Sequence, residues 1–85
     1  MKVHVEVKQK HIDAGIPEAC LNCPVALAIQ ETTGRRWRVM AAMIRHGTEW
    51  IDTPPNVQEF IRDFDAGRKV KPFAFDIKLP EEARK

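Results

Sequence analysis

The chain of 85 residues has no serine and no tyrosine, and each of its four glycines stands alone. These absences exclude a serine nucleophile and a glycine-rich loop that would cradle a phosphate group. No apolar run approaches the ~20 residues that a membrane-spanning helix needs, and the first residues lack the apolar stretch of a signal peptide. We therefore expect a cytoplasmic protein that is not an enzyme and has no membrane partner.

Net charge and cysteine content are also low. The 14 basic and 12 acidic residues give a formal net charge of +2, which does not by itself demand a nucleic-acid partner. Two cysteines are too few for the disulfide framework of a small secreted scaffold. The remaining composition, 44% hydrophobic and 31% charged, is typical of one small globular domain. We place this domain at residues 1–80 and expect the charged tail, residues 81–85, to fray.

The first half of the chain predicts a strand followed by a short and a longer helix. Valine alternates with polar side chains over residues 2–8, which is the pattern of a half-buried strand. Residues 9–14 predict one or two helical turns, and we expect Gly15 to end them in a left-handed conformation. Proline suits the first helical position, so a second helix is predicted over residues 24–33, with Cys23 as its cap.

The second half predicts a hairpin, a helix and a strand. The His46-Gly47 pair suggests a hairpin turn between arms at 37–44 and 49–52, which would place Met43 opposite Trp50. The alternative is a helix over residues 39–44, which alanine and methionine favour. Thr53 is the expected cap of the next helix. The apolar stripe of that helix has i, i+3, i+4, i+7 spacing, and we expect Phe60 and Phe64 in it to be buried against the sheet; the stripe comprises Val57, Phe60, Ile61 and Phe64. Alternation over residues 73–79 predicts the last strand.

This order of elements, β-α-β-β-α-β, is the split β-α-β pattern of ferredoxin-like domains. We therefore predict an α+β fold with a single antiparallel-rich sheet and two helices on one of its faces. The other face would be open to water or to a partner. An exposed Trp37 or Trp50 on that face would mark an interface with a partner or with a second copy in a homodimer.

Cys20 and Cys23 form a C-x-x-C motif at the predicted start of the second helix. A helix N-terminus can stabilise a thiolate, as in thioredoxin-type redox sites, but here the motif does not directly follow a strand. The spacing also suits half of a zinc site, with His11 as the third ligand. Candidates for a fourth ligand are Asp13, Glu18 and His46. A disulfide and two buried thiols are the remaining interpretations; we favour the buried thiols and expect no cofactor, with zinc as the alternative.

A basic cluster gives the strongest binding signal in the sequence. It consists of Arg35, Arg36, Trp37 and Arg38. Arginines beside an indole can hold phosphates and stack a base, and Arg45, Lys69 and Lys71 would add positive charge. A solvated edge strand protected by arginine is the competing structural interpretation. The sequence pI, about 8.7, is below the value of ~9 typical of a dedicated nucleic-acid binder.

Several segments together resemble small proteins encoded by bacteriophages and prophages. The segments are H-I-D-A-G at 11–15, C-L-N-C-P-V-A-L-A at 20–28, T-P-P at 53–55, F-D-A-G at 64–67 and V-K-P-F at 70–73. The similarity extends over about residues 3–79. It implies a phage or mobile-element origin and no assigned activity. Small phage proteins of this size commonly act by binding and blocking a host protein.

These observations lead to three hypotheses about function. The first is a non-enzymatic binding module that engages a host or phage protein through its open sheet face or its hairpin. The second is a nucleic-acid-binding protein that uses the basic cluster at 35–38. The third is a metal- or thiol-dependent domain built on Cys20 and Cys23.

Overall fold

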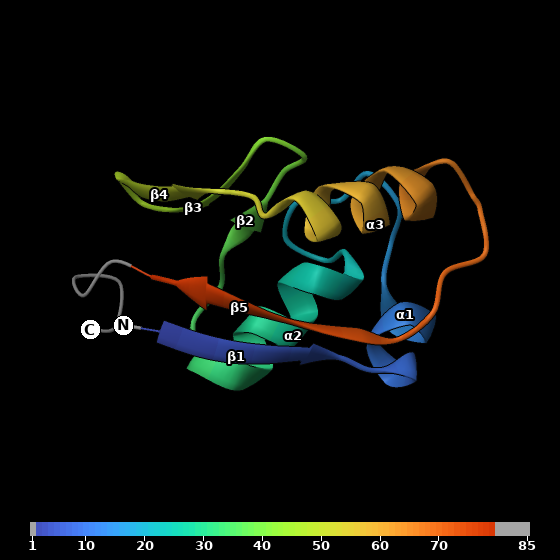
Figure 1. Cartoon of the computed structure of the whole chain (residues 1–85), viewed down its shortest axis with the longest axis horizontal. Coiled ribbons are helices and arrows are strands. Elements are labelled where there is room, and N and C mark those ends of the chain that lie inside the picture. The colour runs from blue at the N-terminus through green and yellow to red at the C-terminus, as the bar shows by residue number, and fades with distance from the viewer. Residues whose placement is uncertain (1, 80–85) are drawn as a thin grey trace.

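The computed structural model describes residues 2–79, so the tail at 81–85 that was predicted to fray lies outside the described residues. Eight elements follow one another along the chain (Figure 1): β1 (Lys2–Val7), α1 (Gln9–Ala14), α2 (Pro24–Thr33), β2 (Arg38–Val39), β3 (Met43–His46), β4 (Glu49–Asp52), α3 (Pro55–Asp65) and β5 (Phe73–Lys78). The predicted α+β class is confirmed. Within residues 2–79, no helix has the length and apolar character needed to cross a membrane.

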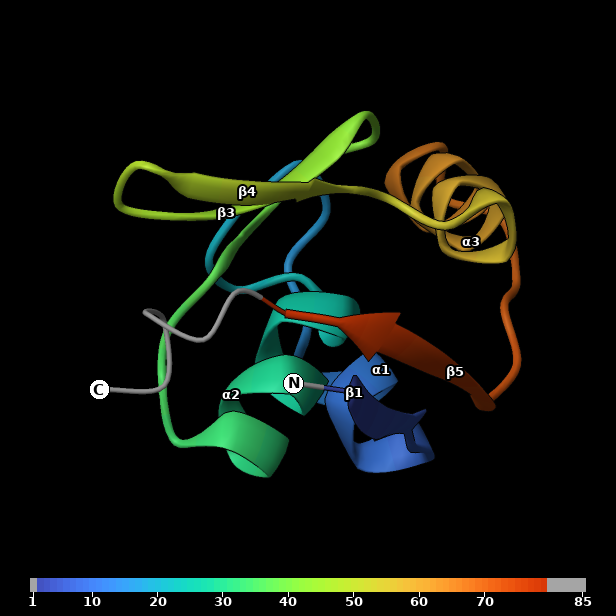
Figure 2. The same cartoon turned by 60° about the vertical axis from the view of Figure 1, so that its left-hand side comes forward.

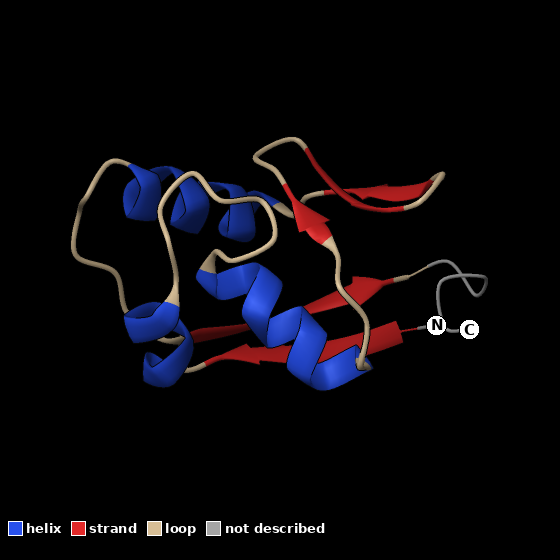
Figure 3. Ribbon diagram, turned by 180° about the vertical axis from the view of Figure 1, so that it is seen from behind, coloured by secondary structure: helices blue, strands red, loops and turns tan. Residues whose placement is uncertain are grey.

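The first and last strands form an antiparallel ribbon, in which Val5 lies opposite Phe75. Every second residue of β1 is buried, because its valines point to one face of the ribbon. Helix α2 lies across this face (Figures 1 and 3). Helix α3 reaches the same face through Phe60, whose ring centroid is 4.7 Å from that of Phe73. The expectation that the main helices share one face of a sheet therefore holds for this ribbon.

The expectation of a single sheet is wrong, because the strands form two separate sheets. Strands β2, β3 and β4 make a three-stranded antiparallel sheet that lies apart from the β1–β5 ribbon (Figure 2). The predicted arm at 37–44 is broken by a turn, in which Met40 N donates to Met43 O at 2.8 Å and the chain folds back on itself. The outer edge of β2 is also occupied, since Val39 N donates to the carbonyl of Cys20 at 2.8 Å.

The β3–β4 hairpin turns one residue later than predicted. Its pairing places His46 opposite Glu49 and Arg45 opposite Trp50, so Trp50 does not face Met43. This pairing puts Gly47 at the first central position of the turn, where its φ is +60°. A glycine at that position is the signature of a type II′ turn, and this requirement fixes the register.

Two predicted helix ends differ from the structure. Gly15 is not left-handed, since its φ is −70°, and α1 ends there in extended backbone. Thr53 does not cap α3; its side chain is buried and its hydroxyl donates to Met40 O at 2.9 Å, which ties the helix entry to the β2–β3 turn. Helix α2 begins and ends as predicted, with Cys23 as its cap and Gly34 in the left-handed region at φ +77°.

The core lies between the ribbon, α2, α3 and the inner face of the three-stranded sheet. The α3 stripe contributes Val57, Phe60 and Ile61, which are buried. Phe64 is only half-buried and stacks on Phe60 at a ring separation of 6.2 Å, so its predicted full burial is wrong. One helical turn beyond Phe60, the helix has already passed the edge of the core.

Candidate functional site

The three-stranded sheet has one apolar and one basic face, because side chains alternate along each strand. The inner row across the sheet is Val39, Ile44 and Ile51. The outer row, in register across the same three strands, is Arg38, Arg45 and Trp50. All three outer residues are exposed, and Trp50 keeps 54% of its surface accessible. We call this outer row the Arg-Arg-Trp row.

Arg38 and Arg45 lie directly opposite each other on β2 and β3. Like charges in this position destabilise a sheet. No carboxylate of residues 2–79 lies within ion-pair distance of either guanidinium. Arg45 Nε donates to the carbonyl of Gly47 at 2.8 Å, which orients the group while leaving its terminal nitrogens without a partner in this part of the chain. The pair is therefore an uncompensated positive site.

A groove of about 560 Å³ runs along this positive site. It is lined by Leu21, Arg36, Arg38, Met40, Arg45, His46 and Gly47. Arg36 is held in place, since it donates to the side-chain oxygen of Asn22 at 3.3 Å. His46 Nδ1 donates to the carbonyl of Arg36 at 3.1 Å. Among residues 2–79, no acidic residue lines the groove; Asp52 is on the same face of the sheet but lies opposite Met43, outside the groove.

The structure divides the predicted basic cluster. Arg36 and Arg38 line the groove, but Trp37 is only 1% exposed and its ring packs against His46 with centroids 5.1 Å apart. The indole of Trp37 is therefore part of the core and is not available to stack a ligand. Arg35 is half-buried beside the end of α2, where its backbone N–H donates to the hydroxyl of Thr33.

Arg45 and Trp50 complete the surface from elsewhere in the sequence. Arg45 is one of the three residues predicted to extend the cluster, but its position opposite Arg38 depends on the register of the β2–β3 turn. Lys69 and Lys71, the other two, line a separate groove of about 430 Å³ between α3 and the segment before β5. They therefore do not extend the Arg-Arg-Trp row.

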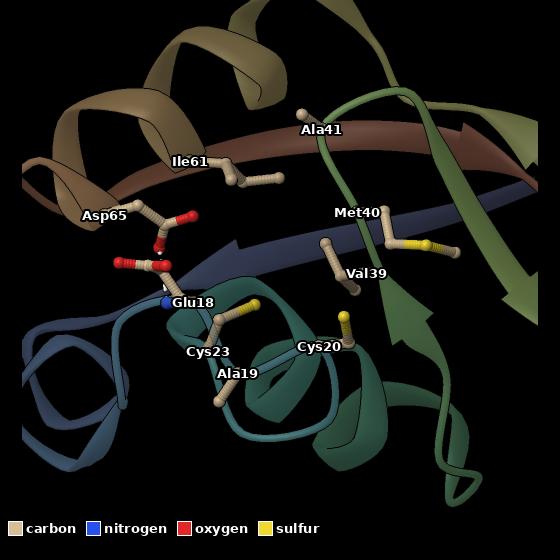
Figure 4. Close-up of a pocket in the computed structure, with 9 residues that line it drawn as sticks. All are labelled: Glu18, Ala19, Cys20, Cys23, Val39, Met40, Ala41, Ile61 and Asp65. Atoms are coloured by element: carbon tan, nitrogen blue, oxygen red, sulfur yellow. Dashed lines mark hydrogen bonds between the residues drawn. The ribbon is translucent and has the colours of Figure 1, made fainter.

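The C-x-x-C motif lines a second pocket, of about 250 Å³ (Figure 4). Its lining residues are Glu18, Ala19, Cys20, Cys23, Val39, Met40, Ala41, Ile61 and Asp65. Burial raises the pKa of the Cys23 thiol. The backbone N–H of Ala26 donates to the sulfur at 3.4 Å and lowers this pKa, but burial has the larger effect. In the described part of the chain, the lining of this pocket has two carboxylates and no basic residue to stabilise a thiolate. This environment keeps Cys23 protonated and suits a structural thiol.

The predicted zinc ligands do not form a metal-binding group. His11 is buried, its Nδ1 accepts the N–H of Lys8 at 2.9 Å, and its Nε2 lies 3.3 Å from a carboxylate oxygen of Glu31. Both ring nitrogens are thus engaged by the ends of α1 and α2. Over the described range 2–79, no three His, Cys, Asp or Glu side chains come together to hold a metal ion. The residues present therefore do not fit a zinc site.

Glu18 is a feature of this pocket that sequence patterns did not indicate. It is the one non-glycine residue of the described chain with positive φ, at +60°. Its backbone N–H donates to the carboxylate of Asp65 at 2.9 Å, which joins the C-x-x-C loop to the end of α3. Figure 4 shows the two carboxylates next to each other at one end of the pocket.

Comparisons of the chain with protein families, with curated proteins and with solved structures found no match. Among residues 2–79, the thiol pocket lacks the groups that would activate a cysteine, whereas the groove beside the Arg-Arg-Trp row has exposed arginines that form no ion pair. The basic face of the sheet is the better candidate.

Proposed function

We propose that this protein is a non-enzymatic binding module and that its binding surface is the basic face of the β2–β3–β4 sheet. One observation carries the proposal: Arg38 and Arg45 lie opposite each other, both exposed, with no carboxylate of residues 2–79 in ion-pair range. An anionic partner placed between them would convert a repulsive pair into two charge-assisted contacts. The ligand class that this surface favours is therefore anionic.

The chemistry of the two pockets supports binding rather than catalysis. The described lining of the groove has three arginines and one histidine but no nucleophile for that histidine to activate. In the other pocket, the Cys23 thiol is buried and caps a helix. Two kinds of partner carry the negative charge that would pair with this basic face. One is a host or phage protein with an acidic surface, and the other is the phosphate backbone of a nucleic acid.

The proposal can be tested with a double variant and a matched control. Arg38→Gln/Arg45→Gln removes the pair, whereas Lys2→Gln/Lys78→Gln removes two positive charges that also lie opposite each other, on the outer face of the β1–β5 ribbon. We expect the arginine variant to elute from immobilised heparin at lower salt than the lysine variant. Equal elution of the two variants would show that only net charge matters and would overturn the proposal.

Stability provides a second readout of the same variant. Removing like charges that face each other should raise the free energy of unfolding by about 0.2–1 kcal/mol. We therefore expect Arg38→Gln/Arg45→Gln to be folded and at least as stable as the natural chain in urea titrations. Weaker heparin retention without any loss of stability would assign the two arginines to binding.

A further inference from the structure

We infer that the anionic partner is a single-stranded nucleic acid, with a phosphate between Arg38 and Arg45 and a base stacked on Trp50. The inference rests on the proposed function and adds the ligand class. It depends on the order of the Arg-Arg-Trp row, in which two guanidiniums and one indole follow one another across neighbouring strands. Neighbouring strands are ~5 Å apart, so the row extends over about 10 Å.

Trp50 favours a nucleic acid over an acidic protein surface as the ligand. Its indole is 54% exposed on the face that carries the arginines, and Trp50 lies directly opposite Arg45. A large aromatic side chain left in water is a binding feature when it adjoins a complementary charged site. The carboxylates of an acidic protein surface pair with the arginines alone, whereas every nucleotide offers a phosphate and a flat π-face together.

The geometry also favours a single strand over a duplex. In a duplex the faces of the bases are stacked on one another, so only an unpaired base can stack on an indole. The basic face belongs to a short, exposed sheet and not to a helix that could enter a major groove. Single strands are bound by other proteins on such combinations of basic groove and aromatic platform.

The groove extends the binding path beyond the row. Arg36 and Arg38 are two residues apart and both line it, so a second phosphate can follow the first along this segment. Asp52, the carboxylate two residues after Trp50 on the same strand, lies outside the groove. A polyanion is therefore directed from Trp50 across Arg45 and Arg38 toward Arg36, away from Asp52.

The test measures binding of a fluorescein-labelled oligothymidylate of roughly twelve nucleotides by anisotropy, at salt concentrations from about 50 to 200 mM. The same strand annealed to its complement, and a labelled poly-glutamate peptide, are the competing ligands. We expect the single strand to bind most tightly, with affinity that falls as salt rises. Arg38→Gln/Arg45→Gln should lower the slope of log affinity against log salt by roughly 0.7, because the one phosphate held between the two guanidiniums is no longer neutralised.

Substitutions of Trp50 distinguish stacking from charge. Trp50→Ala should weaken binding by about 5- to 140-fold and leave the salt slope unchanged, because it removes one base–aromatic stack and no charge. Trp50→Phe should retain most of the affinity. Binding should also quench tryptophan emission in the natural chain and not in Trp50→Phe, since the remaining Trp37 is buried.

The outcomes separate this inference from the proposed function. If Trp50→Ala binds the single strand as well as the natural chain does, or if the duplex or poly-glutamate binds at least as tightly, the inference is wrong. In that case the proposed function still stands, provided that heparin retention depends on Arg38 and Arg45 more than on Lys2 and Lys78. If the arginine and lysine variants behave alike with every ligand, both fail.

Discussion

Gly15 and Pro24 lie in direct contact where the C-x-x-C loop joins α1 to α2. A β-carbon on residue 15 would lie 2.5 Å from Cδ of Pro24, a distance that real side chains do not reach. Glycine is thus required here for close approach and not for a left-handed backbone, since its φ is −70°. The loop that carries both cysteines is anchored by this contact.

This contact predicts that Gly15 and Gly34 respond differently to substitution by asparagine. Gly15→Ala should lower the free energy of unfolding by about 1–3 kcal/mol through overpacking against Pro24. Gly34, by contrast, has open space around it but a φ of +77°, so Gly34→Ala should cost about 1–2 kcal/mol through backbone strain. Asparagine tolerates the left-handed region, so Gly34→Asn should recover stability in urea titrations and Gly15→Asn should not. Recovery at both positions would refute the contact.

His11 predicts a specific capping effect. Its Nδ1 accepts the backbone N–H of Lys8, so it replaces the glutamate or glutamine of a capping box at the start of α1. His11→Ala leaves this N–H without an acceptor and should lower the free energy of unfolding by about 1–3 kcal/mol. His11→Gln supplies a new acceptor and should recover part of this stability in chemical denaturation. Equal destabilisation in both variants would mean that His11 stabilises the fold by packing of its ring and not by the hydrogen bond.

Glu31 predicts a stability that depends on pH. Lys10, 2.8 Å away, and then His11 lower the pKa of this carboxyl below its usual 4.5. A lowered folded-state pKa stabilises the fold above pH 4.5, and this contribution disappears as the pH falls through the lowered value. The natural chain should therefore exceed Glu31→Gln in stability at pH 7, and this advantage should shrink in acid, as the pH falls below 4.5.

The control for this pH effect is Glu6→Gln. Glu6 is exposed on β1, and within residues 2–79 no cation pairs with it. Its substitution should change stability little at pH 7 or in acid, as measured by urea midpoints. A difference between Glu31→Gln and the natural chain that is the same at both pH values would contradict the ion-pair explanation.

The parts of the fold that the sequence predicted correctly have strong local signals. Alternating valines predicted β1, and proline followed by a left-handed glycine marked both ends of α2. The β2–β3 turn was missed because Ala41 and Ala42 form it without glycine or proline. Two alanines suggest a continuous element, so the break in the predicted arm at 37–44 was missed. A single sheet was therefore predicted where the structure has two.

The candidate site depended on the same missed turn. Arg38 and Arg45 are opposite each other only because the chain reverses at Ala41–Ala42. Trp50 joins them because Gly47, and not His46, opens the next turn. Local sequence found the arginines but could not choose between Trp37 and Trp50, which differ only in tertiary burial. The phage origin and the homodimer stay predictions.

Because Phe64 is only half-buried, Phe60 is the α3 aromatic residue that we expect to contribute more to the stability of the core. Phe60 is 8% exposed and contacts the rings of both Phe64 and Phe73, so Phe60→Ala should cost about 3–5 kcal/mol. Phe64→Ala removes a partly exposed ring and should cost clearly less. Thermal and urea unfolding of the two variants measure the difference. A larger destabilisation by Phe64→Ala would contradict the position of the end of α3 beyond the core.

The two cysteines should differ strongly in reactivity. Cys20 is half-buried, whereas Cys23 is buried, caps α2 through its sulfur, and has a pKa that burial raises above the usual 9.0. At a pH of about 8 we expect a thiol reagent such as DTNB to label one cysteine of the folded chain readily and the second only after denaturation. In Cys20→Ser the remaining thiol should react slowly, and in Cys23→Ser it should react fast.

The capping role of Cys23 can be separated from its reactivity with two substitutions of similar size. Cys23→Ala removes the acceptor of the Ala26 N–H and should lower the free energy of unfolding by about 1 kcal/mol more than Cys23→Ser, whose hydroxyl is a good helix cap. Both variants remove the same packing around the sulfur, so the difference reports the hydrogen bond. If Cys23 in the folded Cys20→Ser variant instead reacts faster than in the unfolded chain, the helix N-terminus stabilises a thiolate despite burial, and the C-x-x-C motif becomes a redox-active site.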